Sequence, residues 1–314
     1  MSGRRRGEQP MVPRAEFSSY YGRPVIKSPV WAAPDIAGYL FLGGLAGASS
    51  VLAAGAQLTE RPGLAKVAKS GALAAGCLSL AGLVHDLGRP SRFINMLRTF
   101  KVTSPMSVGS WLLAGYVPVA AASCASAVTG RLPRIGAAAT LGSAVLGPAV
   151  ATYTAALISD TAVPAWHDGY REMPFLFAGS AATAAGGLGL LAAPASEFAP
   201  ARNLAVLGAC GELAAARLME RRLGLVAEPY QRGPSGGFMK AGQVLAAAGL
   251  VGALATLGRP RLGLAGRLAG AAFLAASAVT RWGIFHAGRA SAADPKYTVV
   301  PQRERVEARE SRSG

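Results

Sequence analysis

The sequence predicts an all-α integral membrane protein, a packed bundle of eight transmembrane helices with both termini on the same side. Hydrophobic residues make up 51% of the 314 residues and charged residues only 15%, and the mean hydropathy is +0.33. This composition is more apolar than that of an ordinary soluble domain of similar length. The few charges lie between long apolar runs, each able to cross a hydrocarbon layer of roughly 30 Å, which takes about 20 helical residues.

The first four predicted spans are strongly apolar. Three of them contain no Asp, Glu, Lys or Arg: Ile36 to Leu58, Val102 to Gly130 and Ile135 to Ser159. Between the first two of these, Ala65 to Leu87 forms a span if Lys66 and Lys69 extend to one interface. Small residues such as those from Gly43 to Ala48 allow helix backbones to approach closely in lipid, which favours a packed bundle.

The last four predicted spans are less uniform, and they are Met173 to Ser196, Asn203 to Arg221, Ala241 to Gly258 and Leu262 to His286. The fifth and the seventh span contain no charged residue, although the seventh is short. The eighth carries Arg267 near its start and Arg281 near its end. The sixth span is the most polar, because it contains Glu212, Arg217 and Glu220.

Three regions follow from this pattern. Residues 1–33 form a basic, proline-containing arm, residues 34–287 the eight-helix domain, and residues 288–314 a charged tail expected to pack on a partner or remain disordered. No cleavable signal peptide is evident, because Arg4 to Arg6 are followed by a polar arm. Eight spans put both ends on one side, and the loops there carry more Lys and Arg than the opposite loops, which predicts cytoplasmic termini.

Charge and cysteine content argue against several function classes. The net charge of +16 suits anionic lipid headgroups or an acidic partner, whereas the lack of a soluble domain argues against nucleic-acid binding. Cys77, Cys124 and Cys210 lie in different spans without CxxC spacing, so neither an iron–sulfur cluster nor a disulfide framework is expected. No metal site is predicted, and a haem between His85 and His286 is a minor alternative.

Most titratable side chains, and several aromatic ones, are predicted to lie at the membrane face on the side of the termini. They include Trp31, Tyr39, His85, Asp86, Arg89, Arg92, Tyr153 and Asp160. Asp86 comes at the negative end of a helix dipole, which is unfavourable unless a cation such as Arg89 or Arg92 pairs with it. Such a pair is either an interfacial salt bridge that fixes the turn or a proton-handling pair at a pocket.

The sixth span places charges at membrane depth. An Asp, Lys or Arg at a helix centre costs about 2.5 to 3.5 kcal/mol on insertion scales, and Glu is expected to cost a similar amount. Glu212 should therefore face protein or water, with Arg281 of the eighth span as a possible partner. Arg217 and Glu220 can pair on one helix face. These residues indicate a proton path that also involves Asp160, or else purely structural ion pairs.

A quinone suits a helical bundle that gathers a phenol, an imidazole, carboxylates and aromatic rings at one interface. Its carbonyl oxygens need hydrogen-bond donors, its ring needs an apolar slot, and oxidation of the quinol releases protons that bases must accept. A small-ion or proton-coupled transporter without a redox partner is the alternative. A transporter more often concentrates its polar groups near the midplane, beside broken helices.

Several segments resemble the NrfD-like, polysulfide reductase membrane-subunit family. The most distinctive is HDLGRPSRFINMLRTFKVTSPMSVGSW, from His85 to Trp111. The others are YTAALISDTAVPAW, MPFLFAGSAATAAG, PVWAAPDIAGYLFLGGLAG and RWGIFHAGRASAADPKYTVVPQR. The likeness runs in order from about Tyr20 to Arg303.

This resemblance implies a subunit of the bacterial inner membrane that exchanges electrons between menaquinone or ubiquinone and a ferredoxin-like iron–sulfur subunit. That partner would be connected to a molybdopterin catalytic subunit, so that this chain alone does not transform the terminal substrate and carries neither haem nor iron–sulfur cluster. The implied quinone site comprises Trp31, Tyr39, His85, Asp86 and Tyr153. In it, Tyr153 would donate to a quinone carbonyl, His85 or Asp86 would accept a proton, and Arg89 would keep the acid ionised. Trp31 and Tyr39 could instead be interfacial belt aromatics, and Tyr153 a packing residue.

Overall fold

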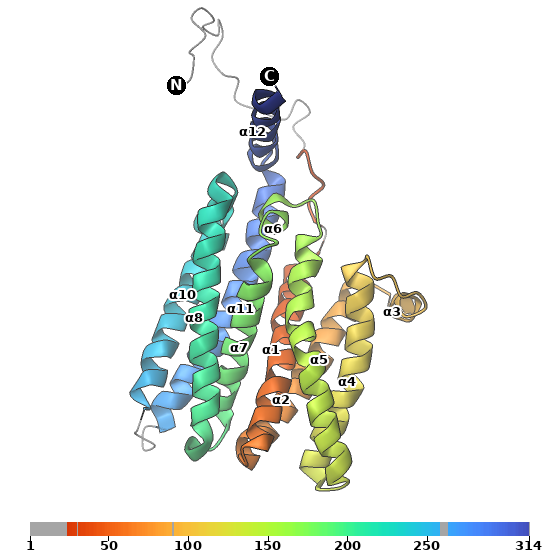
Figure 1. Ribbon diagram of the computed structural model, residues 1–314, viewed down its shortest axis with the longest axis vertical. Helices are drawn as coiled ribbons and strands as arrows, with labels where there is room; N and C mark the ends of the chain where they lie inside the picture. The colour runs from red at the N-terminus through yellow and green to blue at the C-terminus, as the bar shows by residue number, and fades with distance from the viewer. Residues whose placement is uncertain (1–23, 30, 90, 258–262, 314) are drawn as a thin grey trace, which may run out of the picture.

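The computed structural model describes residues 24–29, 31–89, 91–257 and 263–313, which form helices and no β-strand (Figure 1). The long helices are α1 (Ala33–Leu58), α2 (Pro62–Asp86), α4 (Pro105–Thr129), α5 (Pro133–Ser159), α7 (Met173–Ala192), α8 (Phe198–Leu223), α10 (Gly233–Ala255), α11 (Gly263–Ala293) and α12 (Lys296–Ser313). The short ones are α3 (Ser91–Met96), α6 (Pro164–His167), η1 (Ala195–Glu197), η2 (Gly224–Ala227) and α9 (Glu228–Gln231).

Seven of these helices are long and apolar enough to cross a membrane: α1, α2, α4, α5, α7, α10 and α11. They correspond to seven of the eight predicted spans. The remaining predicted span, Asn203 to Arg221, lies within α8, a 26-residue helix that packs along α7. Its charged residues make α8 more polar than the other long helices of the bundle, and it is not among the helices whose length and composition suffice for a span. That α8 also crosses the membrane stays a prediction.

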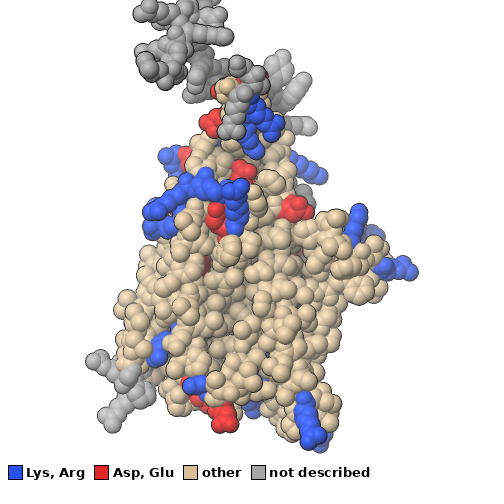
Figure 2. Space-filling view, in the orientation of Figure 1, with Lys and Arg blue, Asp and Glu red and all other residues tan. Residues whose placement is uncertain are grey.

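The surface of the bundle agrees with a multi-pass membrane protein. Lys, Arg, Asp and Glu gather at the two ends of the molecule, and a band without charge separates them on the face shown in Figure 2. Large apolar side chains are exposed on the long helices, among them Val145 of α5 (79% exposed), Leu207 of α8 (72%) and Val251 of α10 (71%). In a membrane, such side chains contact hydrocarbon chains. In water, their exposure would cost about 25 cal/mol per Å² of apolar surface.

Helix α1 lies at the centre of the bundle. It packs against α2, α5, α7 and α11, while α4 joins α2 and α5 on one side and α8 and α10 lie on the other (Figure 1). The helices alternate in direction, so α1 begins and α2, α5 and α11 end near α3, α6 and α12 (Figure 1). We call this the α12 end, and the end that contains the α1–α2 and α4–α5 turns the opposite end.

Two helix boundaries differ most from the predicted ones. Helix α10 begins at Gly233, before the predicted start at Ala241, because a single Lys240 near a helix end does not interrupt the helix. Helix α11 continues to Ala293, beyond the predicted domain boundary at residue 287. In the charged tail, Lys296–Ser313 forms α12, which contradicts the alternative of a disordered tail for this part of the chain. The other alternative, that the tail packs on a partner, stays a prediction.

Close contact between α1 and α5 depends on glycine in both helices. A Cβ atom added at Gly47 would lie 2.3 Å from the carbonyl oxygen of Gly147, and one at Gly147 would lie 2.4 Å from the carbonyl oxygen of Gly47. No side chain fits between two backbones at that distance, because the obstacle is backbone and not a movable side chain. The crossing confirms the importance of small residues for packing in the first span.

Gly47→Val is expected to destabilise the bundle by about 1 to 3 kcal/mol, or to prevent folding, because the added atoms overlap the α5 backbone. Thermal unfolding of the detergent-solubilised protein would measure the loss. Gly55→Val, in the same helix, is the matched control, since a Cβ atom there meets nothing within 4 Å. Equal thermal stability of the two variants would show that the α1–α5 crossing is not as close as described.

Candidate functional site

Two tyrosines meet between α1 and α5, toward the α12 end. The hydroxyl groups of Tyr39 and Tyr153 are hydrogen bonded to each other, and the rings lie edge to face with their centroids 6.2 Å apart. Tyr39 is 2% exposed and Tyr153 is half-buried. Gly109 of α4 provides the space, because a Cβ atom there would lie 2.3 Å from the ring of Tyr153. The sequence predicted both tyrosines as site residues, and the structure brings them together.

An acid–imidazole pair lies one helical turn before Tyr39. Nδ1 of His85, at the end of α2, lies 2.9 Å from Oδ2 of Asp35 in the first turn of α1. The His85 side chain is 78% exposed and that of Asp35 23% exposed. His85 can therefore exchange a proton with solvent while Asp35 fixes the orientation of its ring. Because Asp35 and Tyr39 are four residues apart, they lie on the same face of α1.

Asp86 has other neighbours than those predicted. It lies beside the backbone of Ala32 and the side chains of Asp35 and His85, at the junction of α1 and α2. Within the described residues, neither Arg89 nor Arg92 forms an ion pair with it.

The two arginines lie beyond the end of α2. Arg92 donates from Nη1 to the carbonyl oxygen of Leu87 at 3.2 Å, and Arg89 is exposed. Gly88, with φ +69°, ends the helix, so the chain turns away and Arg92 binds the unpaired carbonyl of the helix terminus instead of the carboxylate of Asp86.

Trp31 belongs to an aromatic stack. Its ring lies 5.9 Å from that of Trp166 in α6, with an interplanar angle of 20°. Trp166 is fully buried, donates from Nε1 to the carbonyl oxygen of Ile284 at 2.8 Å, and contacts Phe285 of α11. The stack fixes the segment before α1 onto α6 and α11. Trp31 thus has a packing role in the structure, whatever its part in ligand binding.

A second polar group lies inside the bundle, between α7, α8 and α11. Arg281 of α11 is 0% exposed, donates from Nη2 to the carbonyl oxygen of Phe177 at 2.8 Å, and stacks over the Phe177 ring at 3.5 Å. Its Nε and Nη1 have no hydrogen-bond partner in the described structure. Nearby, Ser180 of α7 and Ser277 of α11 are hydrogen bonded at 2.8 Å.

Glu212 of α8 lies at the same cluster. It is 4% exposed, its neighbours include Thr280, Arg281 and Ser180, and its Oε2 has no hydrogen-bond partner in the described structure. Glu212 and Arg281 therefore lie near each other, as predicted, but they do not form a direct ion pair among the described side chains. The hydroxyl groups of Ser180, Ser277 and Thr280 also lie at this cluster. Polar groups in such an arrangement can form a hydrogen-bonded network, directly or through water.

The remaining predicted proton-path residues lie at the α12 end. Arg217 and Glu220 line a cavity of about 330 Å³ together with Arg221, Tyr230, Gln231, Met239, Lys240 and Gln243. Glu220 accepts a hydrogen bond from Nε2 of Gln231 at 3.3 Å. Among the described side chains, Glu220 forms no ion pair with Arg217. Asp160 is exposed immediately after α5. Asp160 is thus separate from this cavity.

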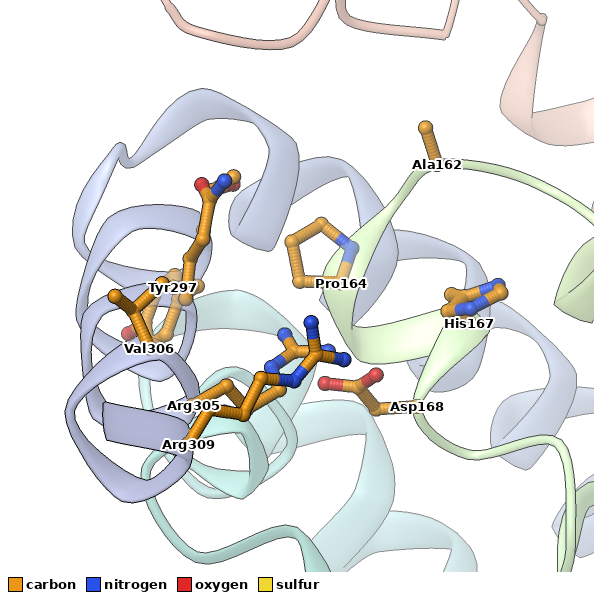
Figure 3. Close-up of a pocket in the computed structure, with 10 residues that line it drawn as sticks. Ala162, Pro164, His167, Asp168, Tyr297, Arg305, Val306 and Arg309 are labelled. Carbon is orange, nitrogen blue, oxygen red and sulfur yellow. The ribbon is translucent and has the colours of Figure 1, made fainter. Parts of the chain in front are cut away.

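Several charged contacts at the α12 end were not predicted. Arg222 binds both carboxylate oxygens of Glu172, at 2.6 and 2.5 Å, and Glu228 binds Lys296 at 2.9 Å. A further cavity, of about 410 Å³, lies between α6 and α12, with the side chains of Arg305 and Arg309 extending toward Asp168 (Figure 3). No sequence pattern indicates these contacts, because the partners are far apart in the chain.

The bidentate contact with Arg222 lowers the pKa of Glu172. A carboxyl group with a lowered folded-state pKa stabilises the protein above its unfolded pKa of about 4.3, and this contribution is lost as the pH falls through the folded pKa.

The resulting prediction is that wild-type protein loses about 1 kcal/mol more stability on acidification below about pH 4.3 than Glu172→Gln does. Thermal unfolding of both proteins between neutral and acidic pH would measure the difference. Arg222→Gln should behave like Glu172→Gln. Parallel curves for the wild type and both variants would contradict a stabilising role of the pair.

No group of three or more His, Cys, Asp or Glu side chains that could hold a metal ion occurs in the part of the chain that the structure describes. The fold and the placement of its polar groups define the class of the protein: a multi-pass helical membrane protein with an acid–imidazole pair at one end and a buried cluster of ionisable groups. A family comparison is more specific. The chain belongs to the family described as polysulphide reductase, NrfD, which matches residues 26–219. A search of curated proteins gave no match.

The family match includes α1 to α7 and most of α8, and therefore all the residues of the tyrosine pair and the acid–imidazole pair. It confirms the family that the sequence motifs indicated. The match is shorter than the likeness noted from about Tyr20 to Arg303, since α10 and α11 lie beyond it.

Proposed function

We propose that this chain is the membrane-embedded, quinone-reactive subunit of a multi-subunit oxidoreductase. Membership of the polysulphide reductase NrfD family supports a role as the membrane subunit of such a complex. The observation that carries the quinone assignment is the convergence of the Tyr39–Tyr153 hydroxyl pair and the Asp35–His85 pair at one end of the bundle.

The four groups fit a quinone by their chemistry. Tyr153 and Tyr39 offer hydroxyl donors among apolar side chains, which is the environment a quinone ring and its carbonyl oxygens require. Bound menaquinone or ubiquinone would supply two-electron, two-proton redox chemistry. The Asp35–His85 pair lies next to solvent and would accept and release the protons of the reaction, and Asp86 adds a second carboxylate to the same junction.

Partners and orientation complete the proposal. A ferredoxin-like iron–sulfur subunit would dock at the α12 end, near the tyrosine pair, and pass electrons to or from a molybdopterin catalytic subunit. The excess of Lys and Arg in the loops at this end supports cytoplasmic termini in a bacterial inner membrane, with α8 as an eighth span.

Glu212, Arg281, Arg217, Glu220 and Asp160 are proposed to form a proton path. Glu212 and Arg281 are buried ionisable groups with unpaired polar atoms, and such groups within membrane spans often mark proton routes. The cavity at Arg217 and Glu220 would be its opening at the α12 end.

Quinol oxidation by the purified complex tests the proposal. The full chain should copurify with an iron–sulfur protein, bind a quinone analogue, and support electron transfer from a quinol. Asp35→Asn should shift the pH profile of turnover more than it changes analogue binding, since Asp35 contacts the imidazole. Ion uptake by vesicles that contain this chain alone, without quinone binding, would instead establish the transporter.

A further inference from the structure

A basic cavity lies at the opposite end of the bundle, away from the proposed quinone site. It has a volume of about 340 Å³, and it is lined by Gln57, Glu60, Arg61, Pro62, Ala65, Lys66, Lys69 and Ala127. These residues come from the end of α1, the α1–α2 turn, the start of α2 and the end of α4. The cavity therefore opens where the apolar band of the bundle meets the polar end.

Positive charge predominates in the cavity. Three cations, Arg61, Lys66 and Lys69, line it with one acid, Glu60. Lys69 is only 8% exposed, and Gln57 positions its Nζ by accepting a hydrogen bond at 2.6 Å. The neighbouring amide orients the ammonium group of Lys69, and two further cations line the same cavity. Such a group is suited to binding an anion.

The backbone amides of α2 are not available to such an anion. Glu197, from η1, accepts hydrogen bonds from the amides of Gly63 at 3.3 Å and Leu64 at 2.6 Å. The side chains of Arg61, Lys66 and Lys69 must therefore hold it. Their full positive charges match the negative charge of a phosphate group.

Apolar residues lie next to the cations. Pro62, Ala65 and Ala127 form part of the cavity wall. Just outside it, Leu58 of α1 is 71% exposed and Val128 of α4 is 58% exposed. A cation cluster bordered by exposed apolar side chains at a membrane boundary has the two halves of a phospholipid site, one for the phosphate and one for the acyl chains.

We propose that this cavity binds the phosphate headgroup of an anionic phospholipid, with Arg61, Lys66 and Lys69 on the phosphate and the acyl chains along α1 and α4. The volume supports a headgroup over a bare ion, because it falls within the range of about 300 to 1,000 Å³ typical of small-molecule pockets. The site is independent of quinone chemistry, which is proposed for the other end.

Lipid retention by the purified full-length protein tests the proposal. The protein would be reconstituted with phosphatidylglycerol, delipidated in detergent, and examined by native mass spectrometry for bound lipid. Arg61→Gln/Lys66→Gln removes two cations and leaves the buried Lys69 in place. At about 1 kcal/mol per cation near a membrane surface, this variant should bind phosphatidylglycerol roughly 30-fold more weakly.

Arg131→Gln/Arg134→Gln is the matched control, because it removes the same charge from the α4–α5 turn at the same end. This control should retain the lipid as the wild type does. Glu60→Gln provides a test of opposite sign, since removal of the one acid in the cavity should strengthen binding several-fold.

Four results would overturn the proposal: no retained phosphatidylglycerol in the wild type, equal loss in the cavity and control variants, equal retention of zwitterionic phosphatidylcholine, or displacement of the lipid by inorganic phosphate at comparable concentration. The last would identify a site for free phosphate. Quinol turnover should be unchanged in the cavity variant, so failure of the lipid test leaves the proposed function intact.

Discussion

Tyr153→Phe is expected to lower quinol turnover by about 10- to 100-fold, the effect of losing one hydrogen bond of about 1.5 to 3 kcal/mol to a group that becomes charged. The substitution removes only the hydroxyl group. The ring of Tyr153 would still fill the recess at Gly109, so the packing of α4 against α5 should remain. Steady-state turnover of the purified complex, with a soluble electron acceptor, would measure the change.

Tyr116→Phe is the control for this experiment. Tyr116 is also buried in the bundle, but its hydroxyl donates to the carbonyl oxygen of Ala46 at 2.6 Å and is hydrogen bonded to Ser50 at 2.7 Å. Loss of the Tyr116 hydroxyl group should lower the stability of the protein by about 1 kcal/mol and leave quinol turnover unchanged. Normal turnover in Tyr153→Phe, or an equal decrease in both variants, would remove Tyr153 from the proposed site.

The fold could be predicted from the sequence because long apolar runs have few alternatives in a membrane. Every predicted span corresponds to a long helix in the structure, including the polar one at α8. The helical tail was missed because α12 is not apolar, and its charged residues resemble those of a disordered segment. Composition gave no sign that the chain continues as a helix after residue 294.

The site could be predicted only in part. Tyr39, Tyr153 and His85 were identified because the predicted topology puts all three on the side of the membrane where the termini lie. Their pairing depends on where helices cross, as at Gly47 and Gly147, and crossing points leave no local pattern. The partner of His85 is Asp35, a residue that the sequence analysis did not select as a site residue.

Charge pairing was the least predictable property. The arginines nearest in sequence to Asp86 were expected to neutralise it, yet Gly88 turns the chain so that Arg92 binds a backbone carbonyl. Sequence proximity favours a pair only when both side chains share a helix face. A turn after the acid removes that condition.

Arg281→Met is expected to destabilise the protein by about 1.5 to 3 kcal/mol, the typical contribution of a hydrogen bond that involves a charged group. Arg281 is fully buried, so methionine can replace most of its volume but cannot donate to the carbonyl oxygen of Phe177. Glu212 would in addition lose the nearest cation. Thermal or denaturant unfolding in detergent would measure the loss.

Glu212→Gln removes the opposite charge and supplies a second measurement. If Glu212 and Arg281 interact electrostatically beside Ser180 and Thr280, the double variant Glu212→Gln/Arg281→Met should be more stable than the sum of the two single effects predicts. Additive effects would show that the charges act independently and would weaken the case for a shared proton path.

Glu212→Gln should also slow proton uptake during turnover more than it slows electron transfer, because an amide cannot carry a proton. Equal slowing of both would assign Glu212 a structural role alone.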